Sequence, residues 1–144
     1  MSANQKWTYE WKTGHIVGFN GKCLDIQNGD AKEGTPIIFW EKGSHNAKTQ
    51  RWFWQRDEKH DYGYFKSMAN PDLVLEIKDG EKGVKEGGEL IVWKQHCNPP
   101  SLAQMWHMDA NGLLRSAHNP KLCIDVEGGI TKATHKICLW TATC

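Results

Sequence analysis

The sequence of 144 residues has no long hydrophobic run and no excess of charge. Its apolar runs reach only four residues, as in Ile37 to Trp40, and its mean hydropathy is −0.65. A membrane-spanning helix needs about 20 apolar residues, so we expect no membrane insertion. The net charge is +1 without a basic cluster, which argues against a nucleic-acid partner. The start of the chain lacks the pattern of a signal peptide, which favours a cytoplasmic or non-classically secreted protein.

Paired cysteines are also missing. The five cysteines are an odd number and form no Cys-x-x-Cys spacing, so a structural zinc site is not expected. We interpret most of them as buried free thiols of a reducing compartment. A bridge from Cys123 to Cys144 remains an alternative. No metal or other cofactor is predicted.

The sequence has no enzyme motif that we recognise. It lacks Gly-x-Ser-x-Gly, His-Glu-x-x-His and a Gly-rich phosphate loop. Its best acidic candidates, Asp25 and Asp125, occupy equivalent positions of an internal repeat. A glycosidase needs an acid and a nucleophile in unlike environments, so we predict a non-enzymatic protein.

Tryptophan is what the sequence has in excess, with eight residues, and three of them belong to a Gln-x-Trp triplet. The triplets begin at Gln5, Gln50 and Gln104, which are 45 and 54 positions apart. Counting from Gln104 through the C-terminus and on from the N-terminus to Gln5 gives 45 again. This spacing predicts a three-fold repeat whose termini fall inside the third repeat.

Each repeat contains short apolar segments separated by Gly, Asn and Asp turns, which predicts strands. The expected strands of the first repeat are 16–17, 23–26, 37–40 and 50–52; those of the second are 64–65, 74–77, 90–93 and 104–106; those of the third are 113–114, 123–126 and 136–140. The N-terminal segment 4–7 would supply the strand that the third repeat lacks. We therefore predict one domain over residues 1–144, an all-β barrel of twelve strands with a hairpin cap.

An acidic residue in the second strand of each repeat precedes a Trp that ends the third strand. The interval is 15 residues from Asp25 to Trp40 and 17 from Glu76 to Trp93. It is again 15 from Asp125 to Trp140. A lone Asp before a turn commonly caps backbone N–H groups, and a Trp is commonly a core residue. The repeated pairing of the two favours a functional role instead.

These residues resemble the β-trefoil lectins of the ricin B-chain type over essentially the whole chain. Residues 21–42, GKCLDIQNGDAKEGTPIIFWEK, are similar to sugar-binding repeats of invertebrate members such as the earthworm lectin. The resemblance implies a β-trefoil of three pseudo-symmetric four-stranded repeats that binds terminal galactose or N-acetylgalactosamine on glycoproteins or glycolipids. The family's intra-repeat disulfide is absent, because Lys42, Gln95 and Ala142 stand at its second cysteine positions.

In this family the acid accepts hydrogen bonds from sugar hydroxyls and the aromatic ring stacks on the sugar's C–H face. An Asn before the Gln-x-Trp triplet donates to the same hydroxyls, and the Gln orients the acid. By resemblance, site one comprises Asp25, Trp40, Thr49 and Gln50; site two comprises Glu76, Trp93, His96 and Gln104; site three comprises Asp125, Trp140, Asn4 and Gln5.

The three sites depart from the family pattern to different degrees. Site three has every part and is built by both ends of the chain. In site one Thr49 replaces the Asn. In site two Ala103 replaces it and the acid is the longer Glu76. The resemblance implies a sugar contact for His96 that compensates for the longer acid.

Several sites on one rigid body predict multivalent, agglutinating binding by a monomer or homodimer. The rival interpretations are a trefoil that binds protein partners, like protease inhibitors or cytokines, and a module cut from a larger toxin or hydrolase. Under any of them, Trp7, Trp52 and Trp106 are expected to lie in the core.

Overall fold

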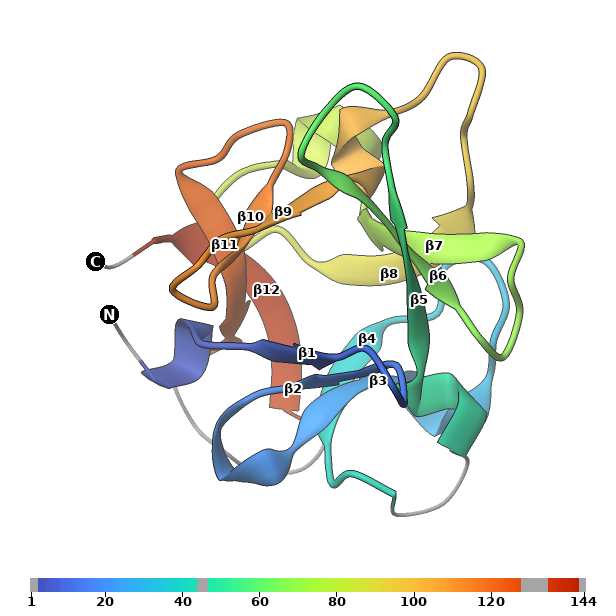
Figure 1. The fold of residues 1–144 in the computed structure, drawn as a ribbon, viewed down its shortest axis with the longest axis vertical. Helices are drawn as coiled ribbons and strands as arrows, with labels where there is room; N and C mark the ends of the chain where they lie inside the picture. Colours follow the sequence, from blue (N-terminus) through green and yellow to red (C-terminus); the bar gives the residue numbers. More distant parts are fainter. Residues whose placement is uncertain (1–2, 44–46, 128–134, 143–144) are drawn as a thin grey trace.

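In the computed structural model we describe residues 3–43, 47–127 and 135–142. Within them, short strands form one antiparallel sheet that curls into a three-lobed body (Figure 1). The strands are β1 (Thr8–Glu10), β2 (His15–Val17), β3 (Cys23–Ile26), β4 (Ile37–Trp40), β5 (Trp52–Arg56), β6 (Gly63–Ser67), β7 (Leu73–Ile77), β8 (Leu90–Lys94), β9 (Trp106–Met108), β10 (Leu114–Ser116), β11 (Leu122–Val126) and β12 (His135–Thr141). The predicted all-β trefoil is confirmed.

Three hairpins of equivalent register form the cap of the fold: β3–β4, β7–β8 and β11–β12. Each hairpin touches the other two, because β4 pairs with β12 and isolated bridges join Pro36 to Ile91 and Glu89 to Cys138. Contacts at equivalent places between all three pairs of hairpins are what a three-fold repeat requires.

The strand predicted at each Gln-x-Trp triplet needs a correction. Gln5, Gln50 and Gln104 each end a short 3₁₀ turn, namely η1 (Ala3–Gln5), η4 (Ala47–Gln50) and η6 (Leu102–Gln104). The strand starts only at Trp52 and Trp106 in two copies, and at Thr8, after Trp7, in the other. The turn has a physical reason: it brings the Gln side chain back over the preceding hairpin, where its amide finds buried partners.

The Trp of each triplet packs in the core, as predicted. Trp52 and Trp106 are completely buried and Trp7 is 4% exposed. Each indole N–H donates to a backbone carbonyl one residue before the acidic position: Trp7 to Ile124 at 3.0 Å, Trp52 to Leu24 at 3.3 Å and Trp106 to Leu75 at 3.1 Å. A buried Trp therefore leaves no unpaired donor, and it ties each triplet to the strand that carries the acid.

Both ends of the chain build the third lobe. The turn η1 lies against β11. The backbone N–H of Trp7 donates to the carbonyl of Gly112 at 2.8 Å. In Figure 1 the blue N-terminal turn lies beside the red C-terminal strand. The predicted joining of head and tail therefore holds for the described residues.

Two further expectations concern cysteines and membranes. Cys23 and Cys138 are buried free thiols and Cys97 is an exposed one. The alternative bridge from Cys123 to Cys144 lies outside the described residues. In the described part of the chain, no helix has the length and hydropathy to cross a bilayer.

Candidate functional site

The hairpin register places each acid beside its Trp. In β3–β4, Cys23 lies opposite Trp40 and Asp25 opposite Ile38. Because alternate residues of a strand share a face, Asp25 and Trp40 are diagonal neighbours on one face of the hairpin. The same offset relates Glu76 to Trp93 in β7–β8 and Asp125 to Trp140 in β11–β12.

These hairpin tryptophans differ from the core tryptophans in exposure. Trp93 is 37% exposed and Trp140 is 46% exposed, and Trp40 is partly buried. Burying an indole contributes strongly to folding, so an exposed one leaves an apolar surface free for other contacts. Each hairpin therefore presents an indole surface near a carboxylate.

The Gln of each triplet holds the acid with the same set of hydrogen bonds. Its Nε2 donates to the carboxylate, at 2.9 Å from Gln5 to Asp125, 3.1 Å from Gln50 to Asp25 and 2.7 Å from Gln104 to Glu76. The same nitrogen donates to the carbonyl just after the hairpin Trp, namely Thr141, Glu41 or Lys94, at 2.8–2.9 Å. One amide thus fixes both the acid and the strand end that carries the indole.

Site three is assembled from the two ends of the chain. Asn4 Nδ2 and Gln5 Nε2 donate to different oxygens of Asp125, which is 6% exposed. Burial raises the pKa of Asp125, and the two amide donors offset part of that rise. The structure therefore brings together Asn4, Gln5 and Asp125, with Trp140 on the same hairpin face as the carboxylate.

In site one, the carboxylate of Asp25 accepts a hydrogen bond through one of its two oxygens. Asp25 is 2% exposed, and its Oδ2 accepts from Gln50. Among the described residues, Oδ1 of Asp25 is buried without a hydrogen-bond partner. Thr49, in the Asn position, is itself buried. Because this oxygen is itself buried, a ligand hydroxyl reaches it only where neighbouring groups move aside.

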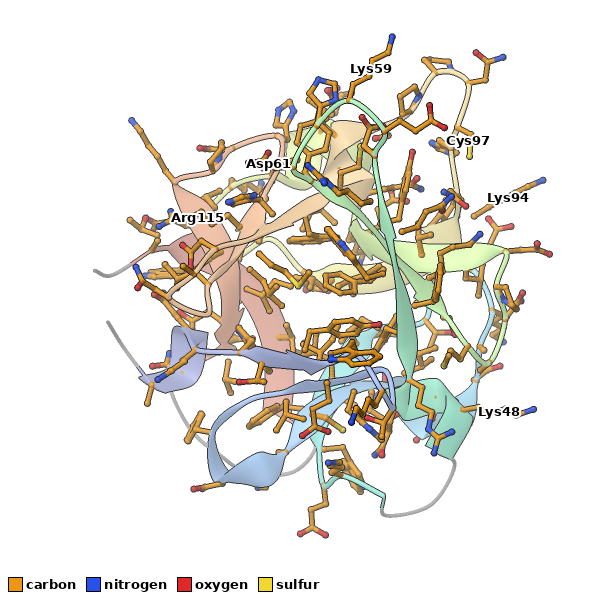
Figure 2. All side chains as sticks on the ribbon, viewed as in Figure 1. Lys48, Lys59, Asp61, Lys94, Cys97 and Arg115 are labelled. Atoms are coloured by element: carbon orange, nitrogen blue, oxygen red, sulfur yellow. The ribbon has the colours of Figure 1, made fainter. Side chains whose placement is uncertain are left out.

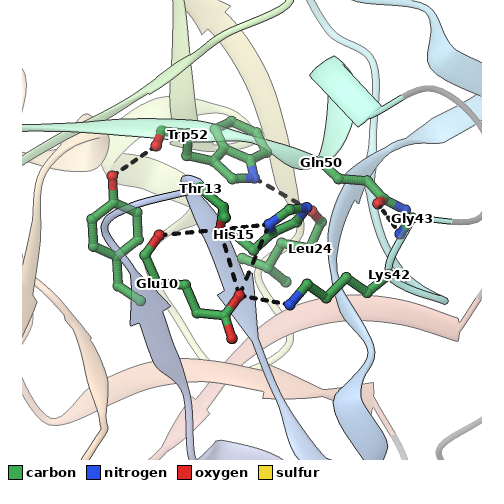
Figure 3. Close-up of polar contacts among 9 residues, drawn as sticks. Glu10, Thr13, His15, Leu24, Lys42, Gly43, Gln50 and Trp52 are labelled. Carbon is green, nitrogen blue, oxygen red and sulfur yellow. Dashed lines mark hydrogen bonds and ion pairs between the residues drawn. The ribbon is translucent and has the colours of Figure 1, made fainter.

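A polar cluster borders site one (Figure 3). Gln50 Oε1 accepts from the backbone N–H of Gly43 at 2.7 Å, which fixes the loop after Trp40. From that loop Lys42 donates to Glu10 at 2.7 Å, and Glu10 also lies 3.9 Å from buried His15. Burial, followed by the charge of Lys42, lowers the pKa of His15. The cluster stabilises the rim of site one, and Gln50 links it to Asp25.

Site two uses a longer acid. Glu76 is 8% exposed, and burial raises its pKa, while the hydrogen bond from Gln104 opposes the rise. His96 is exposed; its backbone N–H donates to Gln104 at 2.8 Å, and its charge acts to lower the pKa of Glu76. The structure thus places His96 near the acid. Lys94 and Cys97 on the same segment lie at the periphery (Figure 2).

One contact was not predicted from the sequence. The loop before β4 packs against β8, where Gly34 N–H donates to Val92 at 2.8 Å and Val92 N–H donates to Thr35 at 3.1 Å. The loop before β8 packs in the same way on β12, where Gly87 and Leu139 pair at 2.8 Å. Each of these loops therefore borders the site of the following repeat. No periodicity within a repeat signals such a contact.

The described residues contain no group of three or more His, Cys, Asp and Glu side chains that is suited to a metal ion. What the three hairpins offer instead is a fixed carboxylate, an exposed indole and amide donors. That set suits a ligand with hydroxyls on one edge and an apolar face.

Comparison with known proteins agrees with this geometry. The model of the ricin-type beta-trefoil lectin domain matches residues 12–144. A segment of 46 residues, 32% of this chain, is 39% identical to nigrin b of Sambucus nigra, of which it spans only 8%.

Two solved structures share the fold. The designed three-fold symmetric protein ThreeFoil superposes with a TM-score of 0.73 at 18% identity, over 85% of this chain and 84% of that one. The C-half of the earthworm R-type lectin, solved in complex with GalNAc, superposes with a TM-score of 0.60 at 23% identity, over 86% of this chain and 83% of that one. Because the family model spans nearly all of the sequence, the chain belongs to the ricin-type beta-trefoil lectin domain family.

Proposed function

We propose that this protein is a non-enzymatic lectin that binds terminal galactose or N-acetylgalactosamine of glycoproteins and glycolipids. The observation that carries the proposal is the repetition of one arrangement three times: an acid held by the Gln of the next triplet, diagonal to a more exposed Trp. A purely structural Gln would not require an indole that is partly or largely exposed at each repeat.

The chemistry follows from what a neutral sugar offers in water. Its hydroxyls donate to a carboxylate whose orientation is already fixed, so little side-chain entropy is lost on binding. Its C–H face covers the indole. An axial hydroxyl, as in galactose, leaves one face of the ring unobstructed for that contact. The earthworm lectin structure with GalNAc supports this choice of sugar.

The three sites are expected to differ in affinity. Site three has an acid and two amide donors that can turn to a ligand, so we rank it first. Site one follows, because it has an Asp held by Gln50 and a Trp but lacks the Asn. Site two is ranked last for neutral sugars, since the longer Glu76 displaces the acceptor. Each site alone binds weakly, and two or more together support agglutination.

Calorimetric titration with lactose, galactose and mannose tests the proposal. We expect binding of the two galactose-type sugars at millimolar concentrations and weaker or no binding of mannose. Absence of binding by galactose and lactose would remove the proposal. Agglutination of erythrocytes, inhibited by free lactose, tests whether at least two sites act at once.

A further inference from the structure

We propose that site two selects an amino sugar with a free ammonium group, because Glu33 of the first repeat adds a second carboxylate beside Glu76 and Trp93. The inference rests on the proposed sugar-binding function and assigns a ligand class to one of its sites. The three hairpins are alike in backbone geometry, so the difference in ligand would arise from side chains alone.

The position of Glu33 follows from how its loop is held. Gly34, the next residue, donates to the carbonyl of Val92, directly before Trp93, at 2.8 Å. A Cβ added to Gly34 would lie 3.6 Å from the indole of Trp93. Pro36 then bridges to Ile91. Two backbone contacts therefore hold this loop against the strand that carries the site-two indole, and Gly34 lies beside that indole.

The acid of site two has unused hydrogen-bonding capacity. Glu76 is 8% exposed and accepts from Gln104 through Oε1 at 2.7 Å. In the described part of the chain, no donor reaches its other oxygen, Oε2. A buried carboxylate with one free oxygen attracts a donor, and a charged donor more strongly than a neutral one.

The two carboxylates are close enough to influence each other. After burial, which is the largest cause, the charge of exposed Glu33 also acts to raise the pKa of Glu76. The charge of His96 has the opposite effect and acts to lower the pKa of Glu76. Glu33 therefore adds negative charge to the surroundings of Glu76, on the strand side that carries the indole.

Site three lacks this feature among the described residues. No second carboxylate contributes to the pKa of Asp125, whose oxygens accept from Asn4 and Gln5. In the equivalent loop of the second repeat, Glu86 accepts a hydrogen bond from the hydroxyl of Thr141. Glu86 is thus engaged by a protein donor, which makes it the matched control for Glu33.

An ammonium group on a sugar ring fits these properties. It supplies up to three charged N–H donors, while the ring's C–H face remains available to Trp93. N-acetylation removes the charge, so the N-acetylated sugar should have no such preference. The expected ligand is a hexosamine in its unacetylated form.

The test follows the indole N–H signal of Trp93 by NMR during titrations of the whole protein. Galactosamine, N-acetylgalactosamine and galactose are compared at about pH 6.5, where the amine is protonated. We expect galactosamine to bind site two about five- to tenfold more tightly than galactose at low salt, with the ratio falling toward one at about 1 M salt.

Glu33→Gln should lower this ratio at site two and leave galactose binding at sites one and three unchanged, whereas Glu86→Gln should preserve the ratio. Equal binding of galactosamine and galactose, or an equal effect of the two substitutions, would overturn the inference while the lectin function stands. A Trp93 signal that no sugar moves would also overturn it. The lactose titration of sites one and three separately decides the proposed function.

Discussion

Gln5 Nε2 donates a hydrogen bond of 2.9 Å to Oδ2 of Asp125, which lies 120 positions away in the sequence. The same nitrogen donates to the carbonyl of Thr141. These two bonds join the first residues of the chain to its last hairpin. They make site three dependent on both ends, and they identify the substitutions that test it.

Replacing the acid of site three should remove one binding site. Asp125→Asn keeps the size of the side chain but places an N–H₂ group against the donors of Asn4 and Gln5. We expect the number of lactose molecules bound per protein to fall by one in calorimetry. Asp61→Asn, at an exposed position that pairs with His107, is the control and should bind like the unmodified protein. An unchanged stoichiometry in Asp125→Asn would exclude site three.

The central glutamine of a site should matter for stability as well as binding. Gln104→Ala removes donors to Glu76 and Lys94 and an acceptor for the N–H of His96. Leaving the buried Glu76 carboxylate without this donor costs about 1–3 kcal/mol, and the two part-buried backbone groups add less, so we expect a loss of about 2–4 kcal/mol in the free energy of unfolding. Urea unfolding measures it. Gln95→Ala, whose partner is Gln55 at the surface, should change it by less than about 0.5 kcal/mol.

Replacing a core Trp should mainly lower stability, whereas replacing a hairpin Trp should mainly remove sugar binding. Trp52→Ala removes a fully buried side chain and should cost about 3–5 kcal/mol of unfolding free energy. Trp140→Ala removes a side chain that is 46% exposed, so its loss of stability should be smaller, while sugar binding at site three disappears. Thermal unfolding and calorimetry together separate these effects. A Trp140→Ala protein that binds sugar at site three would contradict the assigned role.

Acidification should affect stability and binding in opposite directions. Burial raises the pKa of Glu76 and Asp125 in the folded protein. An acid with a raised folded pKa contributes stability below its unfolded pKa and loses that contribution as pH rises through the folded value. Lowering the pH from neutral should therefore increase their contribution to stability, although protonation removes an acceptor and weakens sugar binding.

The pH prediction is measured by urea unfolding and calorimetry across the titration of these acids. In Glu76→Gln, the part of the stability change that comes from Glu76 should vanish. Site three should still lose affinity on acidification. If the stability profiles of Glu76→Gln and the unmodified protein coincide, the raised pKa of Glu76 is refuted.

Cysteine labelling should follow exposure and pKa. Burial raises the pKa of the Cys23 and Cys138 thiols to about 12, so they carry almost no thiolate at neutral pH. Cys97 is exposed on the periphery. In the native protein we expect iodoacetamide to label Cys97 readily, while Cys23 and Cys138 react only after unfolding. Peptide mass spectrometry locates the label, and Cys97→Ser is the control. Rapid native labelling of Cys23 would contradict the buried environment.

Much of the arrangement could be predicted from local pattern. The strands Cys23–Ile26 and Ile37–Trp40 have the predicted bounds, because each is a short apolar segment between turns. The buried indoles of Trp52 and Trp106 were also predicted. The 3₁₀ turns at the Gln positions were missed, since a single turn has no periodicity of its own. What those turns accomplish depends on partners far away in the sequence.

The sequence alone determined the three-fold repeat and the position of an acid, a Trp and a Gln within each copy. It also determined that the N-terminal triplet completes the third copy, because the repeat spacing closes only around the joined ends. The tertiary structure alone decided that Asp25 keeps one oxygen without a partner among the described residues, and that the loop carrying Glu33 packs against the strand of Trp93 in the next repeat. The physical reason is that hydrophobic pattern and turn chemistry act over a few residues, whereas contacts between repeats depend on how whole hairpins pack.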